Sequence, residues 1–328
     1  MMAALAFLLE CAAVAAVVGV LTSLLVGLFL LLPTTGLRPR PAFRADVVFL
    51  LGTLPLQAAL AVVAAAAAPS LGAWVGLGHD HCQSHGHHLH LCILHASGLR
   101  PALAVGGALA LAAFLFRLGG RILDACRTHT RLTALEAMGS PSQGVFPVVA
   151  VPGMPRLCHA AGAFRRRILL SSSLEKALAP EALRAALAHE EAHLRRRDPL
   201  AVVLLSFAGL FMPPPVARAF ASAYRAAAEE ACDAEAALAV GDATVVAEAL
   251  VKMATLQRSA FTAPHVLAFG MLALERRVRH LLEGETHWVA PSRALLLSAS
   301  AGLGMFAFAL LHTHFLHHAV ETALHLFS

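Results

Sequence analysis

The stretch PEALRAALAHEEAHLRRRDPLAVVLLSFAGLFMPPP, residues 180–215, joins a charged helical pattern to an apolar run that ends at three prolines. Pro180 suits the first position of a helix, and apolar residues then recur at helical spacing, so the sequence predicts a helix that begins near residue 180. The apolar run 199–212 has only 14 residues, fewer than the about 20 that cross a bilayer. We therefore expect this run to be a re-entrant or interfacial segment that holds a polar domain against a membrane.

The chain around this stretch is too apolar for an ordinary soluble protein. Hydrophobic residues make up 58% of its 328 residues and charged residues only 14%, whereas soluble domains carry about 25% charged residues. Four segments are long and apolar enough to span a membrane, at about 3–32, 46–68, 101–118 and 293–312. We predict an α-helical polytopic membrane protein of about four spans, with a break after the third span at Gly119 and Gly120.

Lys and Arg are distributed unevenly between the segments that join these spans. Residues 117–197 hold 13 of them and residues 218–293 hold eight, while the loop 76–99 holds none. Because cytoplasmic loops collect basic residues, we place the long segment 119–292 in the cytoplasm and the loop outside. A multi-pass protein of a bacterial-type inner membrane fits this pattern. The net charge of +5 is explained by the same asymmetry, so we expect no direct nucleic-acid partner.

The predicted domains follow from this topology. Residues 1–118 carry three spans and an outer histidine-rich loop at 79–95, and residues 293–328 carry the fourth span and an outer histidine-rich tail. The cytoplasmic segment 119–292 includes the non-spanning run 199–212 and is long enough for one core.

Short strands and a second helix are predicted within the cytoplasmic segment. VFPVVAVPG (145–153) and RRRILLSSSL (165–174) are apolar runs bounded by Pro, Gly and Ser, which predict two or three strands. A helix is predicted for residues 216–240, with Gly241 as its natural end. The segment therefore reads as a mainly α domain of the α+β class.

HEEAH, residues 189–193, places two histidines four residues apart in the first predicted helix. Positions i and i+4 share one helix face, so His189 and His193 can bind one metal ion with Glu190 beside them. Zinc takes imidazole ligands and lowers the pKa of a bound water, on which Glu190 would act as general base. The alternative is that the pattern arises by chance on the polar side of a helix.

EEACD, residues 229–233, lies in the second predicted helix and supplies Glu229 and, four residues later, Asp233. A carboxylate from a separate helix is the third protein ligand that a catalytic zinc site needs, and we assign it to Glu229. Asp233 is then placed to accept a hydrogen bond from a ligand histidine. An ordinary solvated acidic face is the alternative.

Three stretches together resemble one family of proteases: CHAAGAFRRRILLSSSLEKALAPEALRAALAHEEAHLRRRDPL, EEACDAEA and MLALERRVRHLLEG. The chain resembles the membrane-embedded zinc peptidases of the BlaR/MecR type, antibiotic-sensing antirepressors, over about residues 100–312. The resemblance implies three spans, a cytoplasmic gluzincin-like zinc peptidase domain and a fourth span. It also implies roles for individual residues: zinc ligands His189, His193 and Glu229, catalytic Glu190 and orienting Asp233.

The sequence departs from this family after the fourth span. The antibiotic sensors continue into a penicillin-binding domain with a serine nucleophile, whereas only residues 313–328 follow the last predicted span here. We therefore do not expect β-lactam sensing, while cytoplasmic proteolysis is still expected. By resemblance, the substrate is a cytoplasmic regulator such as a transcriptional repressor.

Two histidine-rich segments on the predicted outer face offer a second metal hypothesis. Residues 79–95 and 312–325 hold 12 of the 19 histidines. Imidazoles and thiols together bind zinc, copper or nickel. The candidate outer cluster consists of His79, His81, Cys82, His85, His87, His88, His90 and Cys92. The alternative is a polar loop that tolerates histidine without binding metal.

The combined prediction is a membrane-embedded zinc metalloendopeptidase that cleaves a protein substrate in signal transduction, is surrounded by membrane lipids and can form a homo-oligomer. Two other functions stay open: a membrane quality-control protease of broad specificity, and a non-catalytic metal-binding sensor or transporter. Against the transporter, no predicted span carries the paired Asp and His ligands of an ion pathway. We assign Arg195, Arg196 and Arg197 to contacts with anionic headgroups.

Overall fold

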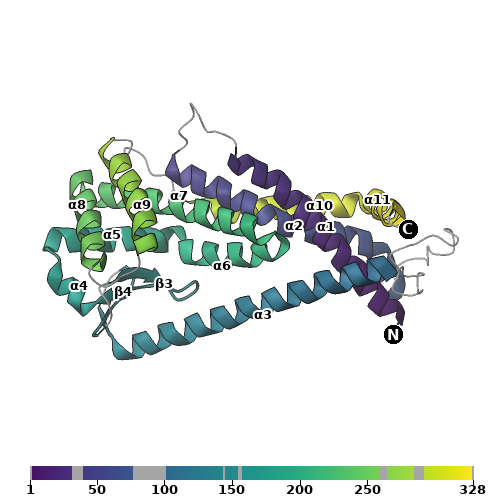
Figure 1. The fold of residues 1–328 in the computed structure, drawn as a ribbon, viewed down its shortest axis with the longest axis horizontal. Helices are drawn as coiled ribbons and strands as arrows, with labels where there is room; N and C mark the ends of the chain where they lie inside the picture. The colour runs from purple at the N-terminus through teal and green to yellow at the C-terminus, as the bar shows by residue number, and fades with distance from the viewer. Residues whose placement is uncertain are drawn as a thin grey trace.

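The computed structural model describes residues 2–31, 40–76, 101–142, 145–153, 157–258, 264–283 and 292–326. Four helices in these ranges are long and apolar enough to cross a membrane. They are α1 (Met2–Leu31), α2 (Pro41–Trp74), α3 (Pro101–Met138) and α10 (Ala294–Leu311), and each contains most of one predicted span. A shorter helix, α11 (Thr313–Leu326), follows α10. Both termini lie at the same end of the bundle (Figure 1), as four crossings require.

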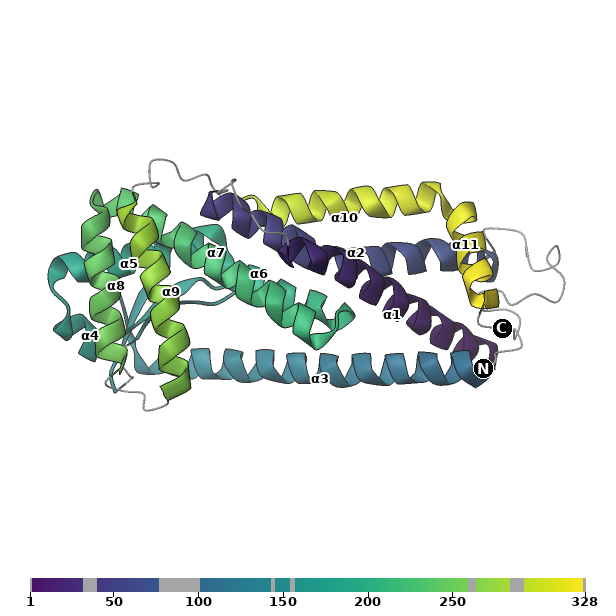
Figure 2. The ribbon, with the colours of Figure 1, turned by 45° about the horizontal axis from the view of Figure 1, so that its top comes forward.

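The third helix differs from the prediction because it does not end near residue 118. It continues through Gly119 and Gly120 to Met138, so the expected break is wrong. A glycine costs only about 1 kcal/mol in a helix relative to alanine. The far end of α3 offsets that cost by packing Leu132 and Leu135 against a sheet. As a result α3 is one continuous rod between the membrane bundle and the sheet, which Figure 2 shows along its whole length.

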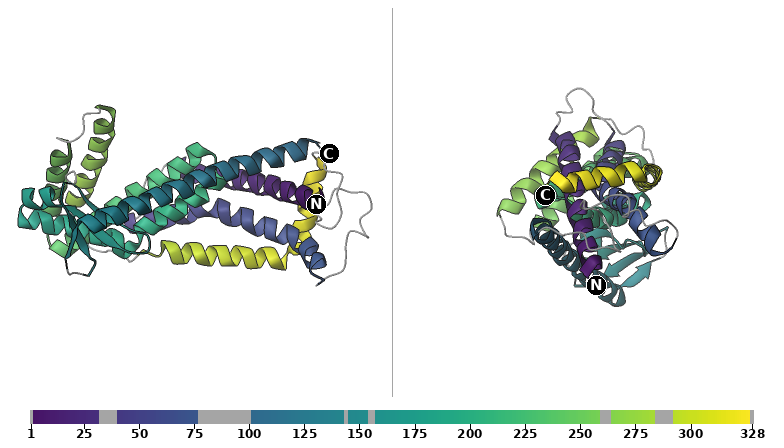
Figure 3. Two further views of the ribbon diagram at one scale, coloured as in Figure 1. Left: turned by 90° about the horizontal axis from the view of Figure 1, so that it is seen from below. Right: turned by 90° about the vertical axis from the view of Figure 1, so that its right-hand side faces the viewer.

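The sheet lies at the end of the molecule opposite the termini (Figure 3) and has four strands in the order β1-β2-β4-β3. Its strands are β1 (Ser140–Ser142), β2 (Val148–Val151), β3 (Cys158–Ala161) and β4 (Arg167–Ser171). β2 and β4 are parallel, and the two outer strands pair antiparallel with them. The two predicted runs form β2 and β4. The sequence did not predict β1 and β3, because SPS and CHAA contain no β-branched residue.

The described part of the segment between α3 and α10 also holds six α-helices: α4 (Ser172–Ala177), α5 (Pro180–Arg196), α6 (Asp198–Ala208), α7 (Pro214–Val240), α8 (Ala243–Arg258) and α9 (Pro264–Leu282). A 3-10 turn, Gly209–Phe211, extends α6. The predicted helix starts and stops hold for α5 and α7: Pro180 is the first residue of α5, and Gly241 ends α7 with a φ of 86°.

One hydrophobic core joins the spans to the rest of the chain. It includes Phe49 of α2, Leu205 of α6, Phe220 and Tyr224 of α7, and Ala294 of α10. The rings of Phe49 and Tyr224 lie 5.8 Å apart. A second core packs α5 against one face of the sheet, through Ile168, Leu170 and Leu194 among others. The helices that carry HEEAH and EEACD are therefore fixed on one side by the membrane bundle and on the other by the sheet.

Candidate metal centre

Helix α5 carries HEEAH in its last two turns and packs beside α7, which carries EEACD. His189 and Glu190 are only 7% and 5% exposed. Four residues after His193, Arg197 adopts a left-handed backbone with a φ of 60°. This turn ends α5 and starts α6 at Asp198, so the chain bends sharply within five residues of His193.

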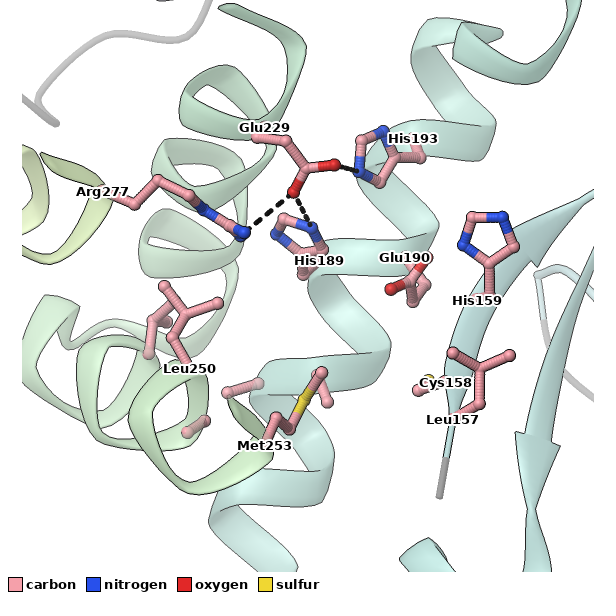
Figure 4. Close-up of a pocket in the computed structure, with 14 residues that line it drawn as sticks. Leu157, Cys158, His159, His189, Glu190, His193, Glu229, Leu250, Met253 and Arg277 are labelled. Atoms are coloured by element: carbon pink, nitrogen blue, oxygen red, sulfur yellow. Dashed lines mark ion pairs between the residues drawn. The ribbon is translucent and has the colours of Figure 1, made fainter. Parts of the chain in front are cut away.

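His189, His193 and Glu229 meet as the sequence predicts (Figure 4). Nε2 of His189 lies 3.4 Å from Oε2 of Glu229, and Nε2 of His193 lies 3.5 Å from Oε1 of the same carboxylate. Two ligand atoms bound at about 2.0–2.1 Å to a tetrahedral zinc ion are separated by about 3.3–3.4 Å. Two imidazoles and one carboxylate at this spacing fit a zinc ion, and they leave the fourth position that catalytic sites keep for water.

Asp233 lies behind His189, as predicted, with its Oδ1 2.9 Å from the ring Nδ1. Arg277 of α9 donates to both oxygens of this carboxylate at 2.7 Å each. A third nitrogen of the same guanidinium lies 3.0 Å from Oε2 of Glu229. Arg277 thus orients one candidate ligand directly and a second through Asp233. Sequence reasoning did not single out Arg277, although it lies in the third stretch of the family resemblance.

Asp198 has the corresponding place behind His193, and the sequence did not predict this role. Its Oδ2 is 2.8 Å from Nδ1 of His193, and its Oδ1 accepts a hydrogen bond from the Tyr224 hydroxyl at 2.7 Å. Arg196 is buried and lies 3.3 Å from the same carboxylate. The assignment of Arg196 to lipid headgroups is therefore wrong, because its side chain neutralises a buried aspartate.

Glu190 lies on the other side of the ligands, between α5 and the outer strand β3. Its Oε2 accepts a hydrogen bond from the backbone N–H of Ala160 at 2.6 Å. The preceding residue of the strand, His159, is exposed and faces the same space (Figure 4). Within the described residues β3 pairs with β4 alone, so its other edge faces Glu190, which takes the Ala160 N–H. Neither Cys158 nor His159 stands out in the sequence as a candidate site residue.

The charges of the centre favour a bound cation. Burial would raise the pKa of Glu229, but the two histidines and Arg277 hold it well below its usual range. Burial would likewise lower the pKa of His189, but contacts with Asp233 and Glu229 raise it to about 9. Burial would also lower the pKa of His193, but Cys232, Asp198 and Glu229 together raise it well above its usual value. The carboxylates thus favour two positive charges at the histidines. Two protons can supply this charge, and so can one divalent metal ion.

A cavity of about 220 Å³ opens onto these residues. The candidate ligands, Glu190 and Arg277 form its polar side. Its apolar side is lined by Leu157, Val246, Leu250 and Met253. The cavity therefore offers a polar reaction centre next to an apolar surface that fits a hydrophobic side chain.

The candidate outer cluster between His79 and Cys92 lies outside the residues that the structure describes. In the tail, His317 is buried, with Nδ1 2.8 Å from the Ala66 carbonyl and Nε2 3.0 Å from Glu321. Over the described ranges, three metal-ligating side chains converge in only two groups, which share His193: one with His189 and Glu229, the other with Asp198 and Cys232. The described tail histidines join neither group.

The sequence matches a known protein family. Residues 105–281, more than half of the chain, match the family described as BlaR1 peptidase M56. The matched region contains every residue of the candidate centre named above. Searches of curated proteins and of solved structures found no match.

Proposed function

The chain belongs to the BlaR1 peptidase M56 family of membrane-associated metallopeptidases, and we propose that it is a zinc metalloendopeptidase whose active site faces the cytosol. The observation that carries this proposal is the spacing of His189, His193 and Glu229. Nε2 of His189 and Nε2 of His193 lie 3.4 and 3.5 Å from the two oxygens of Glu229, and one ligand atom from each residue lies within 4.8 Å of the others, a spacing that suits a tetrahedral zinc ion. Family membership supports membrane association and peptidase activity, and the set of two imidazoles and one carboxylate supports zinc as the metal.

The mechanism assigns a separate task to each side chain. A zinc ion held by the three ligands supplies Lewis acidity and makes a water molecule a stronger nucleophile. Glu190 accepts the proton of the attacking water and returns it to the leaving amine. Asp233 and Asp198 lie at Nδ1 of the two imidazoles and hold them with Nε2 facing Glu229. Arg277 keeps the Glu229 carboxylate ionised and in place.

The substrate binds, in this proposal, as an extended segment along the edge of β3 that does not pair with β4. Main-chain hydrogen bonds to a free strand edge recognise a peptide without regard to most of its side chains. The apolar side of the cavity, with Leu250 and Met253, then receives one hydrophobic side chain near the bond that is cut. A protein with an accessible unfolded or loop segment fits these requirements better than a small molecule.

We further propose a cytoplasmic regulator, such as a transcriptional repressor, as the physiological substrate in a signalling pathway. The excess of Lys and Arg in residues 117–197 supports a cytosolic position for the centre in a bacterial-type inner membrane. Cleavage of one regulator would distinguish this function from a quality-control protease, which would degrade many unstructured proteins.

The test uses the 328-residue chain in detergent or liposomes. The substrate is a repressor that purifies together with it, or casein as a general protein substrate. Glu190→Gln removes the base but no metal ligand, so this variant is expected to bind as much zinc as the wild type while cleavage falls by at least about 10²-fold. Glu191→Gln, on the neighbouring residue, is the matched control. Equal cleavage by wild type and Glu190→Gln would refute the peptidase proposal.

A further inference from the structure

The short apolar helix α6 ends inside the membrane bundle, where its carbonyl groups need partners. The last carbonyls of a helix have no intrahelical donor, and an unsatisfied carbonyl in hydrocarbon costs several kcal/mol. We call residues 209–212 the α6 tip. Arg117 of α3 donates to three carbonyls of this tip: Leu210 at 2.8 Å, Met212 at 3.0 Å and Gly209.

The contacts of the α6 tip place it at membrane depth. Arg117 follows the first residue of α3 by 16 residues, about 24 Å of helix, within the about 30 Å of a hydrocarbon layer. Gly19, in the interior of α1, lies so close to the tip that a Cβ on it would be 2.8 Å from the Phe211 carbonyl oxygen. The ring of Phe211 also lies 5.4 Å from that of Phe114 on α3. We therefore treat α6 as a re-entrant helix whose tip contacts α1 and α3, while Val203 and Leu204 on its outer side are exposed.

The other end of α6 reaches the metal centre. Asp198 is its first residue, and its carboxylate lies 2.8 Å from Nδ1 of His193. Along α6, Leu205 lies against α2, where a Cβ on Gly52 would come within 2.7 Å of it. A single rigid helix thus links three carbonyl acceptors held by a span to the carboxylate that orients a candidate zinc ligand.

We propose that Arg117 is a positioning residue for the metal centre: by anchoring the α6 tip to the third span, it holds Asp198 against His193. This inference rests on the zinc site proposed above. In this proposal Arg117 does more than donate hydrogen bonds to the carbonyl groups of the tip. A movement of α3 relative to α1 would shift the tip, and the shift would reach Asp198 through α6. The same rod contacts the sheet that carries β3, since Leu132 and Leu135 pack there. The third span is thereby connected to both sides of the cavity.

Three variants at two positions perturb the tip without touching the centre. Arg117→Gln removes the charged donor, and Arg117→Lys keeps a charge and donors on a differently shaped head group. Gly19→Ala pushes against the Phe211 carbonyl while leaving Arg117 intact. Their matched controls are Arg121→Gln, one turn further along α3 on an exposed position, and Gly27→Ala, whose Cβ makes only an ordinary 3.6 Å contact.

The readout is the zinc dissociation constant of purified full-length protein, measured by competition with a chelator. We expect Arg117→Gln and Gly19→Ala to weaken zinc binding about 10–100-fold, the usual cost of losing a carboxylate behind a metal-bound histidine. Arg117→Lys is expected to lie between these variants and the wild type, and both controls to match the wild type. If Arg117→Gln does not insert or fold, Gly19→Ala and Arg117→Lys still decide the outcome.

A double-mutant cycle separates positioning from a general loss of stability. If Arg117 acts through Asp198, then Arg117→Gln has no further effect on zinc affinity in an Asp198→Asn background, whereas independent effects add. Additive losses, or unchanged zinc affinity in both Gly19→Ala and Arg117→Lys, overturn the inference. A wild-type protein that binds no zinc instead refutes the proposed function itself, so the two failures are distinguishable.

Discussion

Replacing Asp198 with asparagine removes one charge from the centre while keeping the shape of the side chain. Asp198 is 4% exposed and lies between His193, at 2.8 Å, and Arg196, at 3.3 Å. Removing one partner of a buried ion pair costs about 3–5 kcal/mol, because the other charge is left uncompensated. Weakening the carboxylate behind a ligand histidine lowers metal affinity about 10–100-fold. Asp198→Asn should therefore lose both thermal stability and zinc affinity.

A second variant separates these two losses. Asp198→Asn combined with Arg196→Met removes both buried charges, so most of the stability should return, while zinc affinity stays low because His193 still lacks its carboxylate. Thermal unfolding in detergent measures the first quantity and chelator competition the second. Asp242→Asn is the control: this exposed side chain accepts a hydrogen bond from the Thr244 N–H at 2.7 Å, which asparagine can also do. Wild-type zinc affinity in Asp198→Asn, or its full return in the double variant, would refute this reasoning.

Three further predictions follow from other contacts. Arg277→Met removes the cation that contacts two carboxylates of the centre, and should weaken zinc binding about tenfold. Arg279→Met, at an exposed position, should keep the zinc affinity of the wild type, and equal zinc affinities of the two variants would contradict the role of Arg277. Gly107→Ala brings a Cβ within 2.2 Å of an α1 carbonyl oxygen and should destabilise the bundle by about 1–3 kcal/mol, measured by thermal unfolding. Gly106→Ala, with open space around it, should have no effect, and equal melting temperatures of the two variants would contradict the close contact at Gly107. In the metal-free protein the pKa of His189 is raised from 6.5 to about 9, so its stabilising contribution is complete below pH 6.5 and lost as pH rises through about 9. Zinc binding at pH 7 should then release at least about one proton; calorimetry in buffers of different ionisation enthalpy measures this, and release of none would contradict the raised pKa.

The sequence predicted the parts of the fold that depend on local pattern. Apolar length identified the four spans, Pro180 and Gly241 marked helix ends, and the paired motifs HEEAH and EEACD identified the three candidate ligands, which the structure brings together. Each of these signals is contained in a few neighbouring residues. The prediction of the re-entrant or interfacial run 199–212 also depended only on its length, and its contacts with three spans favour the re-entrant arrangement.

The parts that were missed depend on contacts between distant segments. Asp198 follows His193 by five residues, which on a straight helix would direct it elsewhere. Only the left-handed turn at Arg197 brings it back to the imidazole, and an arginine gives no sequence signal for such a turn. Arg277 and Ala160 reach the centre from a separate helix and from a strand without β-branched residues. Their roles are decided by tertiary packing, which no local periodicity encodes.

The central claim is that His189, His193 and Glu229 bind one catalytic zinc ion, and the content of zinc per purified chain tests it most directly. Wild type and Glu190→Gln, which keep all three ligands, should each contain one zinc ion per chain after exchange into zinc-free buffer. Glu229→Ala removes one ligand and the carboxylate that bridges the two histidines, so its zinc content should fall to a small fraction of that value. A full zinc complement in Glu229→Ala, or no zinc in the wild type, would contradict the account.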